Sequence, residues 1–596
     1  MSKTGFKKVN IRAVFILFSF IIITSMTFLS AGRLDGEVLR ENKHLASFPP
    51  LREEESIRGT VEGTKEGEKE EETPEEKELR IKEERERLEE RRREKYRDFY
   101  VPLPHPDEEK ASPVKARGLY LTGHTVGHPR YQDLLEMVEE TELNALVIDV
   151  KDDHGLMSYS SDISKVQEIG ADETVPVSDM RKVLEELQDK GIFPIARVVV
   201  FKDPYLAEQK PSWAIQRKEG GIWRDRKGVG WTDPYNKKVW DYNIAVAREA
   251  ALMGFREIQF DYVRFPENAS RMDKEAQFPS QSEVPRDKLI QEFLLYAAEK
   301  LEDYNVYLSA DVFGVITTSW GDSDRIGQTW EKLSSSVDYI CPMVYPSHYG
   351  PGYFGFDVPD SYPRETVKHA LRDAIERNAP LKDPAILRPW LQSFTASWIR
   401  GNISYGPQEV RAQIDVALEL GIDEFLLWNA RNRYNSDALL GEEESSERRE
   451  KMIQSRKDAG KDALGRTPSE AVEKFLVALK EGDWRKALPI HRSEDLHYKN
   501  YSSWMKTLTL KPEQFKIAPP AASANKEKWF EEGVTLALEV ELSGEEHHFE
   551  LQEESWEVSM ENHIWRVEPS AEFLKLLKYE KKEENAVNSQ DFRRNS

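Results

Sequence analysis

Short apolar runs alternate with segments of helical periodicity from Ala116 to Asn435. Runs of strand character cover 116–121, 145–150, 193–200, 257–261, 306–311, 339–345, 385–391 and 425–428. Helical patterns cover 131–141, 178–190, 237–253, 286–304, 324–333, 364–377 and 407–420. This alternation indicates βαβ units and therefore a parallel sheet of the α/β class.

The number of strand–helix pairs favours a closed (β/α)8 barrel, the TIM barrel, over a doubly wound open sheet. An open sheet that binds a nucleotide has a glycine-rich phosphate loop after its first strand. Residues 121–124 read Leu-Thr-Gly-His and offer no such loop. Within the segment, Ser178 is a candidate N-cap, Gly191 a helix stop and Pro407 a first-turn proline.

The barrel segment, 112–440, is flanked by regions of different character. A charged linker or stalk spans 32–98, and its run from 80 to 97 predicts a solvated helix, with plain disorder as the alternative. Residues 441–465 form a polar linker with helical character. Residues 466–578 predict a small α+β domain, whose first helix starts at Thr467-Pro468 with Glu470 in a capping box. The tail, 579–596, is polar and is expected to be disordered.

The N-terminus combines a basic segment, residues 1–12, with an apolar stretch from Ala13 to Ala31. Basic residues before an apolar run are typical of an export signal oriented by the positive-inside rule. Leu29 fits poorly at the −3 position of a cleavage site, which favours an uncleaved signal anchor over a secreted form with a cleaved signal peptide. Either alternative places the bulk of the chain outside the cytoplasm, with the membrane as a partner through the N-terminal segment.

Composition narrows the function classes. The net charge of −23 argues against nucleic acid as a partner, because binding phosphates requires a basic surface. The single cysteine, Cys341, excludes an internal disulfide and is expected to be a core residue. Histidines at ligand spacing are missing from the sequence, so no catalytic metal and no other cofactor is expected, which also disfavours a metal-dependent deacetylase.

Working residues of a (β/α)8 barrel stand at the carboxyl ends of its strands. Asp261 ends the fourth predicted strand and Asp311 the fifth, and we predict that these two carboxylates are catalytic. The candidate substrate-binding residues are His124, Asp149, Asp152, Arg197, Lys202, Trp231, Asp233, Arg264, Tyr345, His348, Trp390, Gln392, Trp428 and Asn429. Carboxylates for acid–base and nucleophilic work, together with Trp and Tyr rings that stack on sugars, favour glycoside chemistry.

Alternatives stay open for several of these residues. Asp261 or Asp311 could cap a strand end or pair with Arg264 or Arg197, and Asp149 is a rival catalytic acid. Trp390 and Trp428 could be packing residues, whereas Trp231 lies among loop formers and is the better candidate for a sugar platform. If the fourth and fifth strands are neighbours, Asp261 as nucleophile and Asp311 as acid/base would suit a retaining mechanism.

Several ordered motifs resemble the bacterial family of (β/α)8-barrel domains that is grouped with the glycosyl hydrolases and was long described as a domain of unknown function. They are 116–122 (ARGLYLT), 144–152 (NALVIDVKD), 196–203 (ARVVVFKD), 259–266 (QFDYVRFP), 309–314 (SADVFG) and 342–349 (PMVYPSHY). The resemblance implies a relation to barrel hydrolases of the α-amylase kind, whose nucleophile is an Asp at the end of the fourth strand. That position corresponds to Asp261. Those enzymes have a Glu at the end of the fifth strand, where this chain has Asp311.

The segment from about 467 to 575 resembles the nuclear-transport-factor-2-like superfamily, through 471–476 (AVEKFL) and 565–567 (WRV). That fold implies no activity by itself, and the sequence does not identify a protein partner for this domain. The sequence thus predicts an extracytoplasmic glycoside hydrolase that cleaves a cell-wall or extracellular polysaccharide. The alternative is a non-catalytic, glycan-binding barrel that acts as a surface scaffold or regulator.

Overall fold

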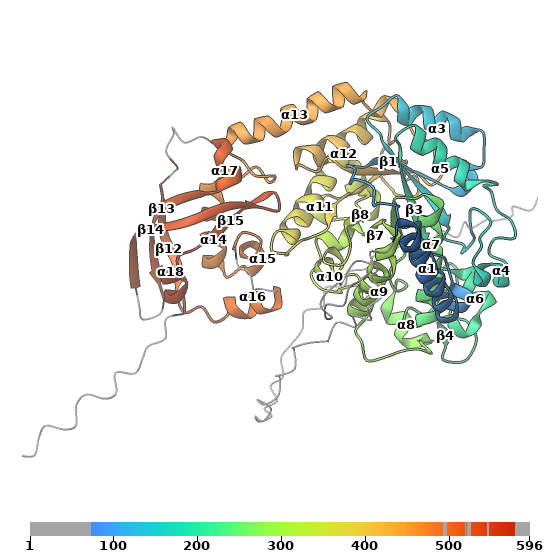
Figure 1. Ribbon diagram of the computed structural model, residues 1–596. Coiled ribbons are helices and arrows are strands. Elements are labelled where there is room, and N and C mark those ends of the chain that lie inside the picture. Colours follow the sequence, from blue (N-terminus) through green and yellow to red (C-terminus); the bar gives the residue numbers. More distant parts are fainter. Residues whose placement is uncertain (1–72, 493–497, 519, 521–525, 545–547, 579–596) are drawn as a thin grey trace, which may run out of the picture. The chain divides into compact units, whose positions relative to one another are not determined.

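The computed structural model describes residues 73–492, 498–518, 520, 526–544 and 548–578 (Figure 1). The chain divides into two units, residues 1–87 and residues 88–596. The predicted basic segment, the apolar stretch 13–31, most of the linker 32–98 and the tail 579–596 lie outside the described residues. Within the described ranges, no helix has both the length and the apolar character that crossing a membrane requires.

The charged run before the barrel forms helix α1, Pro74–Tyr96. Its second half is not freely solvated, because Leu88 and Arg92 are buried. Glu89 accepts a hydrogen bond from the Leu103 backbone N–H at 2.8 Å, and Arg92 donates to the Tyr304 hydroxyl at 2.9 Å. The expectation of a solvated helix therefore does not hold for the last turns of α1, which bear apolar and hydrogen-bonding side chains that pack on the barrel.

Parallel strands form a closed barrel, as predicted. In chain order they are β1 (Arg117–Leu121), β2 (Ala145–Lys151), β3 (Phe193–Val199), β5 (Glu257–Asp261), β7 (Tyr307–Phe313), β8 (Tyr339–Met343), β9 (Ile386–Leu387), β10 (Trp390–Gln392) and β11 (Phe425–Trp428). β1 pairs with both β2 and β11, and β10 pairs with both β11 and β8, which closes the ring. β9 and β10 share the seventh position. Pro389 interrupts this predicted strand because it has no backbone N–H to donate.

Helices connect successive strands (Figure 1). The main ones are α3 (Arg130–Glu139), α5 (Met180–Asp189), α7 (Lys237–Met253), α9 (Arg286–Leu301), α10 (Trp330–Ser334), α11 (Pro363–Asn378) and α12 (Pro407–Glu419). Short elements in the loops are α2 (Gly123–Val126), α4 (Ser164–Ile169), α6 (Pro204–Gln209), α8 (Ala269–Glu275), β4 (Gln216–Arg217) and β6 (Ala276–Gln277). The predicted cap of α5 was wrong by one residue: Asp179, not Ser178, accepts the Lys182 N–H.

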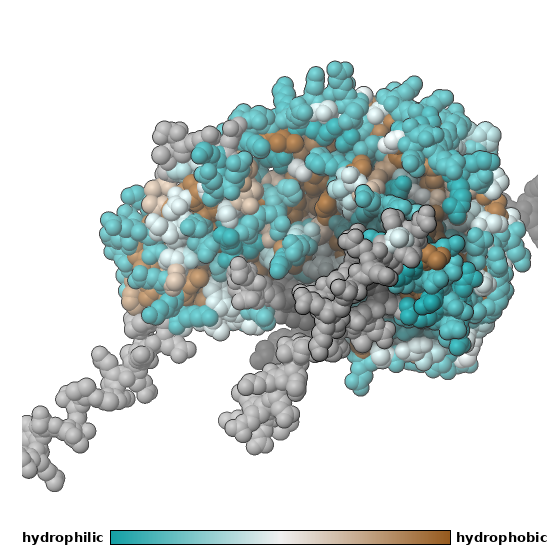
Figure 2. Space-filling model, in the orientation of Figure 1, coloured by the Kyte–Doolittle hydropathy of each residue, from teal (hydrophilic) through white to brown (hydrophobic). Residues whose placement is uncertain are grey.

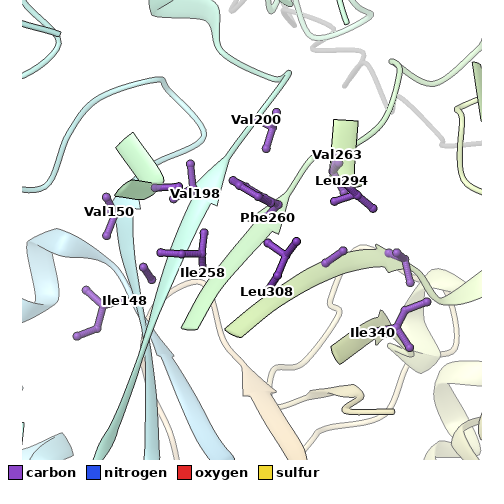
Figure 3. Close-up of a cluster of buried hydrophobic side chains, with 14 of the residues drawn as sticks. Ile148, Val150, Val198, Val200, Ile258, Phe260, Val263, Leu294, Leu308 and Ile340 are labelled. Carbon is purple, nitrogen blue, oxygen red and sulfur yellow. The ribbon is translucent and has the colours of Figure 1, made fainter. Parts of the chain in front are cut away.

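The two faces of each barrel strand are both buried, which explains the continuous apolar runs in the sequence. Outward side chains such as Ile258 and Phe260 belong to the buried apolar cluster between the strands and the helices (Figure 3). The Phe260 ring meets the Phe293 ring of α9 with 5.3 Å between the centroids. A second apolar cluster fills the barrel interior and includes Ile195 and Cys341, which is fully buried as expected. The interior is therefore a packed core and not a pore.

The amino-terminal end of the barrel contains a buried ion cluster that the sequence analysis did not predict. Arg388 makes two bonds of 2.8 Å to Glu257 and one of 2.8 Å to Glu424. Arg388 and Glu257 have no exposed surface. Removal of one partner would leave an uncompensated buried charge in this cluster, which is strongly destabilising. The cluster therefore links β5, the seventh strand position and the start of β11.

The part of the chain after the barrel contains helix α13 (Glu442–Ala459) and a small α+β domain. Its elements are α14 (Pro468–Glu481), α15 (Trp484–Ala487), α16 (Tyr498–Met505), β12 (Lys511–Ile517), α17 (Lys526–Glu532), β13 (Val534–Ser543), β14 (His548–Glu561), β15 (Ile564–Glu568) and α18 (Ala571–Leu576). The strands form an antiparallel sheet in the order β12-β13-β14-β15. The capping box at Thr467 and Glu470 is formed as predicted. The face of the molecule in Figure 2 is mainly hydrophilic, in keeping with the high charged content.

Candidate active site

Strand register brings the two predicted catalytic residues to the same level of the barrel. β5 and β7 are neighbours, and their last paired residues are Phe260 and Ala310. Asp261 and Asp311 each follow one position later, so both side chains are turned to the barrel interior at its carboxyl end. Both are buried, with 5% and 2% of their surface exposed. The two residues therefore lie on adjacent strands, as predicted, with Asp261 at the end of β5. The predicted end of the other strand was wrong, because β7 continues two residues beyond Asp311 to Phe313.

Arg197 of β3 bridges two of the acids. Its Nη2 lies 2.5 Å and its Nε 3.0 Å from Asp261 Oδ2, and its Nη1 donates to Asp149 Oδ1 at 2.6 Å. The alternative that Asp261 pairs with Arg197 is thus realised, whereas Arg264 bonds the carbonyl of Phe265 instead. Burial lowers the pKa of Arg197, but the charges of Asp261 and Asp149 raise it well above its usual range, so the guanidinium stays charged.

Asp311 is bound by an indole and not by a cation. The Trp390 Nε1–H donates to Asp311 Oδ1 at 2.6 Å. Burial, and next the negative charge of Asp261, raise the pKa of Asp311 well above its ordinary value. The surroundings of Asp311 therefore favour its neutral form. The neighbouring Asp261 differs in its contacts, because it bonds the Arg197 guanidinium directly. A carboxyl group whose pKa is raised, next to a second carboxyl group that bonds a cation, is an arrangement suited to acid–base chemistry on an acetal.

Asp149 is the third acid of this layer. It accepts hydrogen bonds from the Tyr120 hydroxyl at 2.7 Å and from Arg197. Burial raises its pKa to about 6, against the lowering effect of Arg197. One oxygen of Asp149 accepts from Tyr120 and the other from Arg197. Asp149 therefore orients the guanidinium group that donates to Asp261.

The backbone after Asp261 is strained. Tyr262 has a φ of 49°, in the left-handed region that residues other than glycine rarely adopt. In this conformation its N–H donates to Asp261 Oδ1 at 2.6 Å. Strain of this kind costs about 1–3 kcal/mol and collects at functional sites. Both oxygens of Asp261 are thereby fixed in position.

Aromatic rings line the barrel mouth. Tyr120 and Trp428 stack at 4.0 Å, and Trp390 meets Trp428 edge to face at 5.5 Å. Trp428 is half-buried, so part of its ring is open to solvent, whereas Trp390 is buried and its role is the bond to Asp311. Tyr345 is buried nearby; burial and then the charges of Asp311 and Asp261 raise its pKa well above the usual value.

Polar side chains from the loops after β3 and β8, Lys202 and His348, lie at the rim of the barrel mouth. Lys202 lies 2.6 Å from Asp153 and its ammonium stands 4.5 Å from the centre of the Tyr262 ring. His348 is exposed by surface area, yet desolvation by the surrounding protein lowers its pKa to about 4. His348 is therefore neutral at neutral pH and contacts Tyr345 edge to face.

Other predicted substrate-binding residues have structural partners. Trp231 is 3% exposed and donates to Asp225, because the loop after β3 folds over it; the expected sugar platform is not there. Asp233 is fully buried and accepts from the N–H groups of Tyr235 and Ser280. Gln392 and Asn429 hold loops together, Asp152 closes a turn, and His124 is exposed on α2.

Three residues near the site were missed by the sequence analysis: Tyr120, Asp153 and Tyr262. Tyr120 stands within β1 rather than after it, and the period of two places it on the inward face with Gly118. Asp153 directly follows the candidate Asp152, and Tyr262 directly follows the candidate Asp261, so their closeness to the strand ends is the signal in the sequence. In the described ranges, no group of three His, Cys, Asp or Glu side chains is placed to hold a metal ion.

Residues 118–434, more than half of the chain, match the model of a family described as "Putative glycosyl hydrolase domain". The chain belongs to this family. The match covers the barrel from β1 to the loop after β11, including every strand that contributes to the site. The predicted family resemblance is therefore confirmed for the barrel.

Solved structures with similarity to this chain include a hypothetical protein from Ruminiclostridium thermocellum. The identity is 45%, 33% of this chain and 97% of that chain are covered, and the TM-score is 0.30. The glycoside hydrolase domain of PgaB from Bordetella bronchiseptica has 12% identity, 54% and 95% coverage, and a TM-score of 0.38. An α-galactosidase from Thermus thermophilus has 13% identity, 58% and 63% coverage, and a TM-score of 0.35. No curated protein matches the chain.

Proposed function

We propose that this protein is an extracytoplasmic glycoside hydrolase that cleaves a cell-wall or extracellular polysaccharide by a retaining mechanism. One observation carries the proposal. Two carboxyl groups, Asp261 and Asp311, lie on neighbouring strands and have different partners. Asp261 bonds the Arg197 guanidinium, whereas Asp311 is bonded by the Trp390 indole N–H and has its pKa raised by burial. Membership of the glycosyl hydrolase family supports the same reaction class.

In the proposed reaction, the Asp261 carboxylate attacks the anomeric carbon and forms a glycosyl ester. Asp311 transfers its proton to the departing glycosidic oxygen, so that the leaving sugar is released as an alcohol. Asp311, now ionised, then takes a proton from the water that hydrolyses the ester, which regenerates both groups. Neighbouring strands are about 4.8 Å apart, close to the separation of about 5–5.5 Å between the two carboxyl groups of retaining enzymes.

The surrounding residues have supporting roles in this proposal. Arg197 and the Tyr262 N–H hold the two oxygens of Asp261, and Trp390 holds Asp311. Trp428 offers a partly open ring to a sugar at the barrel mouth. Lys202 and His348 stand at the rim, where they can donate to or accept from sugar hydroxyls.

The same contacts favour a second candidate, a non-catalytic barrel that binds glycan as a surface scaffold or regulator. Asp261 already accepts from Arg197 and from the Tyr262 backbone, so a nucleophilic oxygen must give up a bond before it attacks. In this case both carboxyls would serve to bind sugar hydroxyls. Glycan binding that persists in Asp261→Asn and Asp311→Asn, with no turnover by the parent, identifies this function.

The test is release of reducing ends from a panel of bacterial and extracellular polysaccharides by the full-length chain. Asp261→Asn is expected to abolish release while leaving the melting temperature within a few degrees of the parent. Glu249→Gln is a matched control, because it replaces another buried barrel carboxyl outside the site and should keep full activity. Activity that survives Asp261→Asn removes Asp261 from the mechanism.

The proposed location rests on the basic and apolar N-terminal segments, 1–12 and 13–31. We expect the full chain in the membrane fraction, with the barrel accessible to protease added outside intact cells. Removal of residues 1–31 should leave the protein in the cytoplasm. Equal distribution of both forms would contradict the anchor.

A further inference from the structure

Among the large apolar side chains of the described residues, Trp398 is the most exposed, at 67%. It lies in the loop that follows β10, the strand segment that also supplies Trp390 to the site. Single exposed hydrophobic residues are common on protein surfaces and need no function. The surroundings of Trp398 set it apart.

The ring of Trp398 is held in place from beneath. It stacks on Phe394 with 6.0 Å between centroids and 19° between planes, so that one indole face is covered and the other is open. Phe394 in turn contacts Tyr345 at 5.9 Å and His348 at 6.5 Å. A chain of rings thus leads from Tyr345, beside Asp311 and Asp261, out to Trp398.

The loop that carries Trp398 is tied to its neighbours. The Ser361 hydroxyl donates to the Gly401 carbonyl at 2.8 Å, and the Tyr405 hydroxyl donates to the Asp360 carbonyl at 3.0 Å. The Tyr405 N–H also bonds the Thr395 hydroxyl at 3.0 Å. A ring presented on a fixed loop loses little conformational freedom when a ligand stacks on it.

We propose that the open face of Trp398 is a distal subsite that stacks on a pyranose ring of a polysaccharide, two ring contacts away from Tyr345. This inference rests on the proposed action on glycans and extends it. The substrate must be a chain long enough to reach from the strand-end carboxyls to Trp398. Trp398 is separated from Tyr345 by ring-to-ring steps of 6.0 and 5.9 Å, so we expect that a disaccharide held at Asp261 and Asp311 does not contact it.

The experiment compares the full-length parent, Trp398→Ala, Trp398→Phe and the control Leu295→Ala, which removes an exposed apolar side chain from α9. The substrates are chito-oligosaccharides and cello-oligosaccharides from disaccharide to hexasaccharide. Loss of one stacking contact is expected to lower kcat/KM of Trp398→Ala for the hexasaccharide about tenfold. The disaccharide value should stay unchanged, and Trp398→Phe should recover most of the loss.

Equal loss at every chain length, or no loss at any length, overturns the subsite. If the parent turns over none of these sugars, the proposed hydrolysis fails separately, and binding is read by affinity electrophoresis in gels with glycol chitin, hydroxyethyl cellulose or soluble peptidoglycan strands. Slower migration of the parent than of Trp398→Ala in one gel then supports the subsite. The subsite is overturned if no glycan slows the migration of the parent. It is also overturned if Trp398→Ala migrates as slowly as the parent in every gel.

Discussion

Replacement of Trp390 by Phe tests how the protein sets the proton on Asp311. The change keeps an aromatic ring but removes the N–H that lies 2.6 Å from Asp311 Oδ1. This bond lowers the pKa of Asp311 against the larger effects of burial and of Asp261, because it is stronger to the ionised than to the neutral carboxyl. The difference is about 1–1.5 kcal/mol, which corresponds to an upward pKa shift of about one unit in the variant.

The assay is the pH profile of kcat/KM for reducing-end release, whose alkaline limb reports loss of the proton from the acid in the free enzyme. The limb of Trp390→Phe should move about one pH unit upward. Trp330→Phe is the matched control, because Trp330 is also buried and donates its indole N–H to Asn378, away from the site. An alkaline limb that stays in place or moves downward in Trp390→Phe refutes Asp311 as the acid, as does an equal shift in Trp330→Phe.

Three further predictions concern stability. Burial raises the pKa of Glu249 from 4.5 to about 7. Between these pH values the folded state keeps a proton that the unfolded state loses. The free energy of unfolding should therefore fall by up to about 3 kcal/mol as the pH rises from 4.5 to 7. Glu249→Gln should remove this part of the pH dependence of the melting temperature; an unchanged slope contradicts it. Arg388→Met leaves the buried Glu257 and Glu424 without their cation and should lower the free energy of unfolding in urea by about 3–5 kcal/mol. The control Arg271→Met breaks an exposed ion pair and should lower it by under about 1 kcal/mol. Equal losses in the two variants would refute the importance of the buried cluster. Trp231→Ala should cost about 3–5 kcal/mol without raising KM, and a raised KM with little loss of stability would restore Trp231 as a sugar platform.

Much of the barrel was predictable from local pattern. Strands buried on both faces appear as uninterrupted apolar runs, and the helix 237–253 and the strand 425–428 were predicted with the bounds that the structure has. The seventh strand was predicted as continuous, although Pro389 divides it, and the cap of α5 was misplaced because Ser178 and Asp179 are both good N-caps. Boundaries of this kind depend on one hydrogen bond, which neighbouring residues can supply equally well.

The site was predictable only in part, for a physical reason. Parallel topology alone brings acids near the carboxyl ends of the strands to one edge of the barrel. The proximity of Asp261 and Asp311 therefore follows from the order of their strands in the sequence. The choice of Arg197 as the partner of both Asp149 and Asp261 depends on side-chain directions across three strands. The burial of Trp231 depends on how a long loop folds back on itself, which no short sequence pattern encodes.

Covalent trapping in Asp311→Asn tests the central claim most directly. This variant lacks the group that activates water, so an aryl glycoside with a good leaving group should glycosylate Asp261 faster than the ester is hydrolysed. Peptide mapping by mass spectrometry is expected to find one glycosyl unit on the peptide that contains Asp261 and none in Asp311→Asn that also carries Asp261→Asn. Turnover of the aryl glycoside with the sugar on another residue, or with no covalent species at all, would contradict the account.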